Sequence, residues 1–112
     1  MRKRTVAVVL VAAVAAIAAL PVFAAPPKLQ GTVGPGFTIS MKTKPTKAGK
    51  YVLSVSDKSN IHNFHLTGPG VNVLTSVGFV GTKSFTITLK KGTYKYVCDP
   101  HATIMKGSFT IK

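Results

Sequence analysis

Alternation of apolar and polar residues is the feature that most constrains the fold of this chain. In the first such run, Phe37, Ile39 and Met41 alternate with polar residues. A side-chain period of two places successive residues on opposite faces of a β-strand. The same alternation recurs in three later segments: residues 51–55, 84–89 and 109–111. The pattern therefore predicts an all-β domain built from short, half-buried strands.

Turn signals separate these runs. Gly, Pro, Asn and Asp favour turns because they tolerate or pre-set the backbone angles that turns need. Such residues gather at positions 34–36, 44–45, 48–49, 57–60, 68–70, 78–81 and 90–92. Residues 71–80 are expected to hold a short strand plus a loop, and no window has the 3.6-residue period of an amphipathic helix. Strands at this spacing predict a small antiparallel β-sandwich or barrel.

The N-terminal segment has the composition of an export signal. Arg2, Lys3 and Arg4 precede an unbroken apolar run over residues 6–20, and small residues lead up to Ala24. We expect a signal peptide over residues 1–24, a flexible leader over 25–30 and one domain over 31–112. The protein would then work in the periplasm, at the cell surface or as a secreted protein. An uncleaved membrane anchor is the alternative, although a spanning helix needs about 20 apolar residues.

Few acidic residues and a single cysteine exclude several kinds of site. Asp57 and Asp99 are the two carboxylates of the chain, which argues against paired-carboxylate acid–base catalysis and all-oxygen calcium or magnesium sites. One cysteine excludes an internal disulfide framework and a multi-cysteine zinc site. The remaining candidates for chemistry are the histidines and Cys98.

Strand parity separates the histidines. His62 shares its parity with Phe64, and Cys98 shares that of the tyrosines before it, so both are expected to point into the core. His65 and Asn63 lie on the opposite parity. We therefore interpret His65 as a surface or second-sheet histidine without a ligand role.

The segment after Cys98 adds two further donors. Cys98, His101 and Met105 follow the spacing Cys-x2-His-x3-Met on a loop stiffened by Pro100. Together with His62 they offer two imidazoles, a thiolate and a thioether, a set that suits copper in both oxidation states. Zinc accepts His and Cys but gains little from Met, so it is the weaker interpretation. Metal ligation also explains an unpaired cysteine in an exported chain.

These residues resemble the cupredoxins, the small blue copper proteins, and in particular their plastocyanin-like and amicyanin-like branch. The matching segments are residues 62–64, 91–101 and 105–107. The resemblance implies a Greek-key β-sandwich of about seven short strands with one type 1 copper ion. It also implies that His62, Cys98 and His101 are equatorial ligands and that Met105 is the axial ligand. Three residues separate His101 from Met105, whereas plastocyanins have four and amicyanin-like loops have two.

The resemblance also implies roles for the neighbours of the ligands. Asn63 corresponds to the asparagine whose hydrogen bonds tie the first ligand's strand to the cysteine loop, and Pro100 supports that loop. Electrons are expected to pass through the solvent-facing edge of His101. Residues expected to dock a partner surround this edge: Ala102, Ile104 and Lys58.

Positive charge dominates the domain. After residue 24 the chain has 12 Lys against 2 Asp, a formal net charge of +10. The lysines are scattered and do not interleave with exposed aromatic residues, which argues against nucleic-acid binding. We expect a monomer that meets redox partner proteins with acidic surfaces, or contacts an anionic membrane or wall surface.

The expected function is electron transport by Cu(II)/Cu(I) cycling, and not catalysis. A Cys–His hydrolase would need an orienting third group and an oxyanion donor, and no residues of this chain supply them convincingly. A copper-binding or copper-delivery protein, with copper as cargo, is the alternative. A closed redox site is strongly blue when oxidised, whereas a carrier exchanges copper readily and is pale.

Overall fold

Residues 2–3, 5–13, 20 and 24–112 are described by a computed structural model of the chain. Within these residues, no helix has the length and apolar character needed to cross a membrane. The expected signal peptide falls largely on positions outside the described residues, namely 1, 4, 14–19 and 21–23. Its cleavage after Ala24 stays a prediction.

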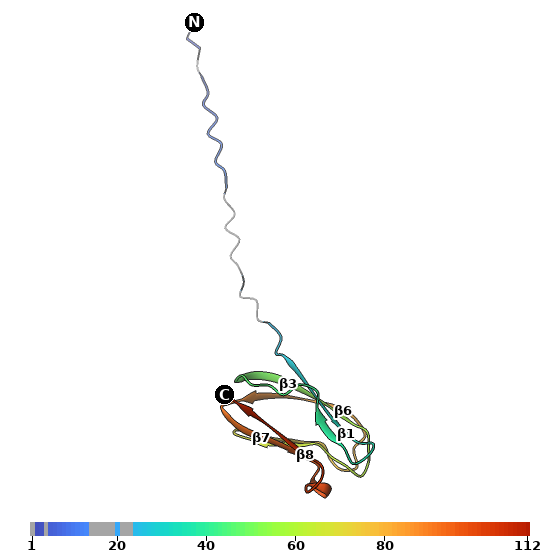
Figure 1. Cartoon of the computed structure of the whole chain (residues 1–112). Coiled ribbons are helices and arrows are strands. Elements are labelled where there is room, and N and C mark those ends of the chain that lie inside the picture. The colour runs from blue at the N-terminus through green and yellow to red at the C-terminus, as the bar shows by residue number, and fades with distance from the viewer. Residues whose placement is uncertain (1, 4, 14–19, 21–23) are drawn as a thin grey trace.

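Two four-stranded sheets pack face to face (Figure 1). The first has the order β2-β1-β3-β6, with β1 at Lys28–Val33, β2 at Ile39–Met41, β3 at Gly49–Asp57 and β6 at Gly81–Leu89. The second has the order β5-β4-β7-β8, with β4 at His65–Gly68, β5 at Val71–Leu74, β7 at Gly92–Val97 and β8 at Lys106–Ile111. The predicted all-β sandwich is confirmed, with eight described strands where about seven were expected.

The pairing of β1 with β3 differs from the antiparallel expectation. These two strands run parallel, with Lys28 opposite Val52 and Val33 opposite Asp57. The other pairings among the described strands are antiparallel. Side-chain alternation has a period of two in both kinds of sheet, so the sequence pattern does not distinguish them.

The sandwich begins earlier than the predicted boundary at residue 31. Strand β1 starts at Lys28, and the Val52 N–H donates a hydrogen bond to the Pro27 carbonyl at 3.0 Å. Leu29 is 3% exposed, and its burial against the second sheet stabilises this strand. Residues 28–30 therefore belong to the domain and not to a flexible leader. A single apolar residue beside two prolines is too short a pattern to predict this strand.

Stacked aromatic rings fill the core near β7 and β8. Phe64 stacks on Tyr96 at 5.6 Å between ring centroids, and Tyr94 stacks on Phe109 at 5.3 Å. A Cβ atom at position 107 would overlap the Tyr96 ring. Glycine at this position therefore allows the ring to pack directly against β8. This packing fixes β7 against β8, the two strands that carry the predicted ligand loop.

The loop between β7 and β8 lies at the end of the sandwich away from the C-terminus (Figure 1). It contains the short 3₁₀ helix η1 at Asp99–His101 and returns to the sheet at Lys106. Residues 58–64, which precede β4, and Phe37 reach the same end of the sandwich. Residues 71–80 form β5 and a following loop, as predicted.

Candidate metal centre

Three donor atoms from separate parts of the chain converge at this end of the sandwich. His62 Nδ1 lies 3.1 Å from His101 Nδ1. Cys98 Sγ lies 3.7 Å from His62 Nδ1 and 3.6 Å from His101 Nδ1. The sequence predicted that these three residues would share a site, and the structure brings them together.

The spacing of these atoms suits a bound metal ion. Metal–nitrogen distances of about 2.0–2.1 Å and metal–sulfur distances of about 2.3 Å require ligand atoms about 3–4 Å apart. The observed separations of 3.1–3.7 Å lie in this range. Two imidazoles and a thiolate are the donors of trigonal blue-copper sites. In the part of the chain that the structure describes, this is the one cluster of three or more potential His, Cys or acidic ligands.

Backbone hydrogen bonds close the loop that carries Cys98. The His101 N–H donates to the Cys98 carbonyl at 3.0 Å, and the Met105 N–H donates to the His101 carbonyl at 2.8 Å. The Cys98 N–H donates to the Met105 carbonyl at 3.0 Å, which joins the two ends of the loop. Pro100 lies in the first turn of η1, where its missing N–H costs no hydrogen bond. The Cys-x2-His-x3-Met spacing therefore folds back on itself.

Burial distinguishes the four predicted ligands. His62 and Cys98 are 0% exposed and Met105 is 1% exposed, whereas His101 is partly exposed. The neighbouring Ile104 is 66% exposed. His101 is therefore the member of the set that connects the site to the surface.

Phe37 contacts both imidazoles, which the sequence did not indicate. Its ring centroid lies 5.0 Å from that of His62 and 4.9 Å from that of His101, in edge-to-face geometry. The alternation grouped Phe37 with Ile39 in one strand, but β2 begins only at Ile39 and Phe37 is 57% exposed. The turn signal at residues 34–36, directly before Phe37, was the indication that it lies in a loop.

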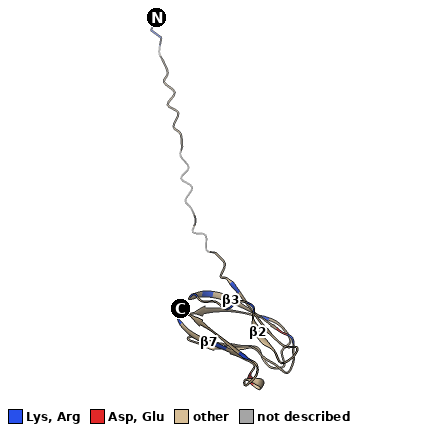
Figure 2. Ribbon diagram, viewed as in Figure 1, with Lys and Arg blue, Asp and Glu red and all other residues tan. Residues whose placement is uncertain are grey.

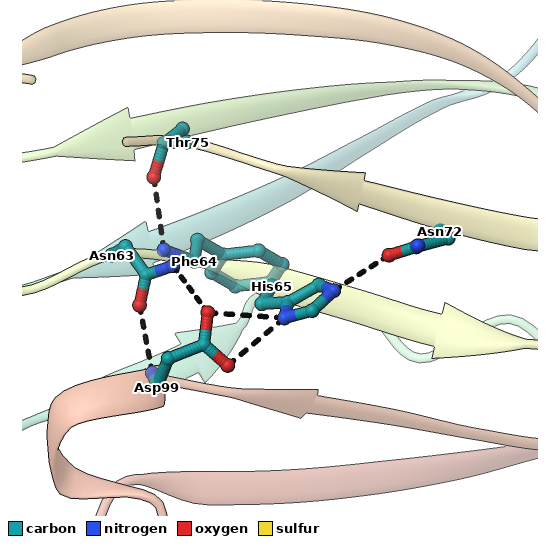
Figure 3. A network of polar contacts seen from close by, with 6 residues as sticks. All are labelled: Asn63, Phe64, His65, Asn72, Thr75 and Asp99. Carbon is teal, nitrogen blue, oxygen red and sulfur yellow. Dashed lines mark hydrogen bonds and ion pairs between the residues drawn. The ribbon is translucent and has the colours of Figure 1, made fainter. Parts of the chain in front are cut away.

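Asn63 joins the His62 segment to the residue after Cys98. The Asp99 N–H donates to Asn63 Oδ1 at 2.7 Å, and Asn63 Nδ2 donates to Asp99 Oδ2 at 2.8 Å (Figure 3). Strand parity placed Asn63 on the outer side with His65, yet Asn63 is 1% exposed. The parity argument was wrong here because β4 begins only at His65, so residues before it need not alternate.

His65 lies on the outer side of this contact and outside the cluster of donors. Its Nδ1 is 2.9 Å from Asp99 Oδ1 and 3.0 Å from Oδ2, and its Nε2 is 2.6 Å from Asn72 Oδ1 (Figure 3). Partial burial disfavours the imidazolium, but the hydrogen bonds to Asp99 and Asn72 and the charge of Asp99 outweigh it. The pKa of His65 is therefore raised above its ordinary value of 6.5.

The Asp99 carboxyl shifts in the complementary direction. Desolvation disfavours its charge, but the hydrogen bonds from Asn63 and His65 and the charge of His65 outweigh that cost. The pKa of Asp99 is consequently lowered below its ordinary value of 3.8. The raised pKa of His65 and the lowered pKa of Asp99 both widen the pH range over which the two residues form a charged pair.

A second hydrogen-bond network holds the segment that precedes β4. The buried Asp57 carboxylate accepts the Ser59 N–H at 3.1 Å and the Thr75 hydroxyl at 3.0 Å. The same Thr75 oxygen accepts the Phe64 N–H at 2.9 Å. The segment that carries His62 is thus fixed on both sides. Two polar residues 18 positions apart give no sequence signal of such a pair.

Exposed charge on the described domain is almost entirely positive. Figure 2 marks Lys positions in blue on the ribbon of both sheets. Asp57 is buried, and Asp99 is paired with His65. Lys58 is exposed and directly follows β3, and its N–H donates to the Val33 carbonyl at 2.9 Å.

Comparisons with known proteins agree with a copper site. Copper binding proteins of the plastocyanin/azurin family match residues 32–112. A structure of reduced rusticyanin at 1.9 Å has a TM-score of 0.58 and 25% identity, over 80% of this chain and 82% of that chain. A second, determined by NMR, has a TM-score of 0.55 and 26% identity over 76% of each chain. No curated protein sequence matches the chain.

The family match supports both the fold and the metal site. Residues 32–112 contain all four predicted donors and most of both sheets. The converging His and Cys atoms are the donors that a copper ion requires in this fold. The chain is therefore a copper-binding cupredoxin and belongs to the plastocyanin/azurin family.

Proposed function

We propose that this protein carries single electrons between redox partners, with one type 1 copper ion as its redox group. The observation that supports this proposal most directly is the convergence of two imidazoles and a thiolate around a point that is buried except at His101. Bound copper would supply the one-electron Cu(II)/Cu(I) couple. The chain's own hydrogen bonds hold these side chains in place, so little movement is needed when the charge of the site changes.

We assign His62, Cys98 and His101 as the equatorial ligands and Met105 as the axial one. The donor distances support the first three. Burial of Met105 and its backbone bonds to both Cys98 and His101 support the fourth. A thiolate and a thioether favour Cu(I), and imidazoles suit both states, so the mixed set serves a redox role. Asn63 and Pro100 hold the ligand loop.

The surface around His101 is the proposed point of electron exit. Ala102 and Ile104 are exposed beside it and offer an apolar contact that permits close approach. Lys58 is exposed four residues before His62. Its charge, with that of the other lysines, would steer a partner with an acidic surface to a monomeric carrier.

We also propose that the protein is exported, with residues 1–24 removed. The composition of this segment and the use of the single cysteine inside a metal site support an extracytoplasmic location. The net positive charge would then also permit contact with an anionic membrane or wall surface. Mass spectrometry of the protein recovered from the producing cells tests the cleavage after Ala24.

An optical spectrum of the oxidised, copper-loaded protein tests the electron-carrier proposal. We expect intense visible absorption from the thiolate-to-copper transition and its reversible loss on one-electron reduction. The alternative, in which copper is cargo, predicts a pale protein that yields its copper rapidly to a chelator. A colourless oxidised protein with rapid exchange would overturn the redox assignment.

A further inference from the structure

Asp99, the residue after Cys98, contacts His65, and metal ligation does not require this contact. We propose that His65 is a positioning residue of the copper centre. By holding the Asp99 carboxylate, it fixes the Cys98–Asp99 peptide against Asn63 and so sets the direction of the Cys98 thiolate. This inference rests on the proposed ligand roles of Cys98 and His62.

The first step is the position of the Asp99 carboxylate. Its Oδ2 accepts Asn63 Nδ2 and also lies 3.0 Å from His65 Nδ1, while the Asp99 N–H donates to Asn63 Oδ1. Asp99 therefore contacts both the nitrogen and the oxygen of the Asn63 side-chain amide, and Asn63 directly follows His62. The Asp99 side chain is 47% exposed, so without His65 the carboxylate can turn into solvent. The Asn63 amide would then lose an acceptor.

The second step is the rigidity of His65 itself. It opens β4, where it pairs with Leu74 of β5 and Val97 of β7. Its Nε2 reaches Asn72 Oδ1 at 2.6 Å, so both ring nitrogens face acceptors. Two hydrogen bonds and two neighbouring strands fix the ring, and sites supported by strands are held more accurately than sites on loops.

The third step concerns the lysines of the domain, which compete with Asn63 for the Asp99 carboxylate. The domain carries 12 Lys against 2 Asp, and Asp57 is buried, so Asp99 is the accessible acidic side chain of the described domain. Mobile lysine side chains would draw a free carboxylate away from Asn63. A histidine fixed in the sheet keeps it directed at the ligand loop.

Two substitutions separate the role of Nδ1 from that of Nε2. His65→Asn places an amide N–H near the position of Nδ1 and keeps a donor for Asp99. His65→Gln places its N–H near the position of Nε2 and keeps only the contact with Asn72. Thr67→Ala is the matched control, because Thr67 is exposed on the same strand, on the same side as His65.

Amide hydrogen exchange in the metal-free protein is the first measurement. We expect the Asp99 N–H to exchange about tenfold faster or more in His65→Gln, because its acceptor Asn63 is no longer held. It should stay within about twofold of wild type in His65→Asn and Thr67→Ala. If His65 served only the stability of the fold, His65→Gln would speed hydrogen exchange at core amides of β3, such as the Val55 N–H, as much as at the Asp99 N–H.

Copper affinity, measured by competition with a Cu(I) chelator, is the second measurement. Loss of a hydrogen-bonding partner behind a metal ligand typically lowers affinity about 10–100-fold. We expect a loss of this size in His65→Gln and near wild-type affinity in His65→Asn. Equal behaviour of the two variants, or no effect of either, would overturn the positioning role. A wild-type protein that binds copper without a visible charge-transfer band would instead contradict the proposed electron-carrier function.

Discussion

His62 Nδ1 and His101 Nδ1 lie 3.1 Å apart although 39 positions separate the two residues in the chain. Two nitrogen lone pairs repel each other unless a proton or a metal ion lies between them. Their approach is imposed by the hydrogen bonds of the ligand loop and by the packing of Phe37 against both rings. The site is therefore preorganised for a cation.

Preorganisation predicts that Cys98→Ser loses the copper site and keeps the fold. A hydroxyl does not replace the thiolate as the donor of the visible transition, so the blue band should be absent. Copper at about 100 times its dissociation constant should stabilise the wild-type protein by about 2.7 kcal/mol and leave the variant nearly unchanged. Thermal unfolding with and without copper measures this difference. A persistent visible band in the variant would contradict the site assignment.

Alternation predicted the sandwich because burying one face of a strand imposes a period of two on its side chains. The same rule placed Cys98 and His62 in the core correctly. It was wrong at Phe37 and Asn63, which lie outside the strands, where side chains need not alternate. His62 also precedes β4, so its burial does not follow from alternation alone. The parallel pairing of β1 with β3 leaves the period unchanged, so alternation alone could not show it.

The contact of Asn63 with the cysteine loop was expected from the family resemblance, but the other supporting contacts of the site were beyond sequence patterns. Asp57 and Thr75, or His65 and Asp99, become partners only when distant strands meet. Cys98, His101 and Met105 lie close together on one loop, so their spacing could be recognised from the sequence. Local spacing reveals ligands, whereas long-range hydrogen bonds require the folded chain.

Thr75→Val should destabilise the protein through the Asp57 network. Valine matches the shape of threonine but removes the hydroxyl, which leaves the Phe64 N–H without its acceptor and the buried carboxylate with one donor fewer. Lost hydrogen bonds to buried charged groups cost about 1.5–3 kcal/mol. Urea unfolding of the metal-free protein measures the loss. Thr67→Val, at an exposed position, should change stability by less than about 0.5 kcal/mol.

Gly107→Ala should disturb the packing of β8. The added methyl group would overlap the Tyr96 ring, which is buried and stacked on Phe64. Overpacking of this kind costs about 1–3 kcal/mol. Gly36→Ala is the control, since no atom lies within 4 Å of the position its Cβ would take. Similar unfolding midpoints for the two variants would show that the Tyr96 ring adjusts freely.

The contribution of His65 to stability should depend on pH. Its pKa is raised in the folded protein, so its stabilising effect is fully present below about pH 6.5 and is lost as pH rises through the folded pKa. The pair is partly exposed, so the effect should be at most about 1 kcal/mol. Unfolding of the metal-free wild type and His65→Gln at pH 5.5 and 9 measures it, because shared titrating groups cancel in the difference. A larger difference at pH 9 would refute the assigned sign.

Positive charge around the exit site should control the rate of electron transfer. The Debye length falls from about 30 Å at 0.01 M salt to about 8 Å at physiological ionic strength, so attraction of an anionic reagent weakens across this range. We expect the rate of oxidation of the reduced protein by hexacyanoferrate(III) to fall as salt rises. Oxidation by a cationic cobalt phenanthroline complex should become faster.

Charge reversal locates the lysines that matter. Lys58 is four residues before His62, whereas Lys112 lies at the C-terminus, at the end of the sandwich away from the ligand loop (Figure 1). Lys58→Glu and Lys112→Glu change the net charge equally, so any difference between them reports on position alone. Because the interaction weakens with distance, Lys58→Glu should slow hexacyanoferrate(III) at low salt more than Lys112→Glu does. Equal slowing by both variants would mean that net charge, and not a steering surface near His101, governs the encounter.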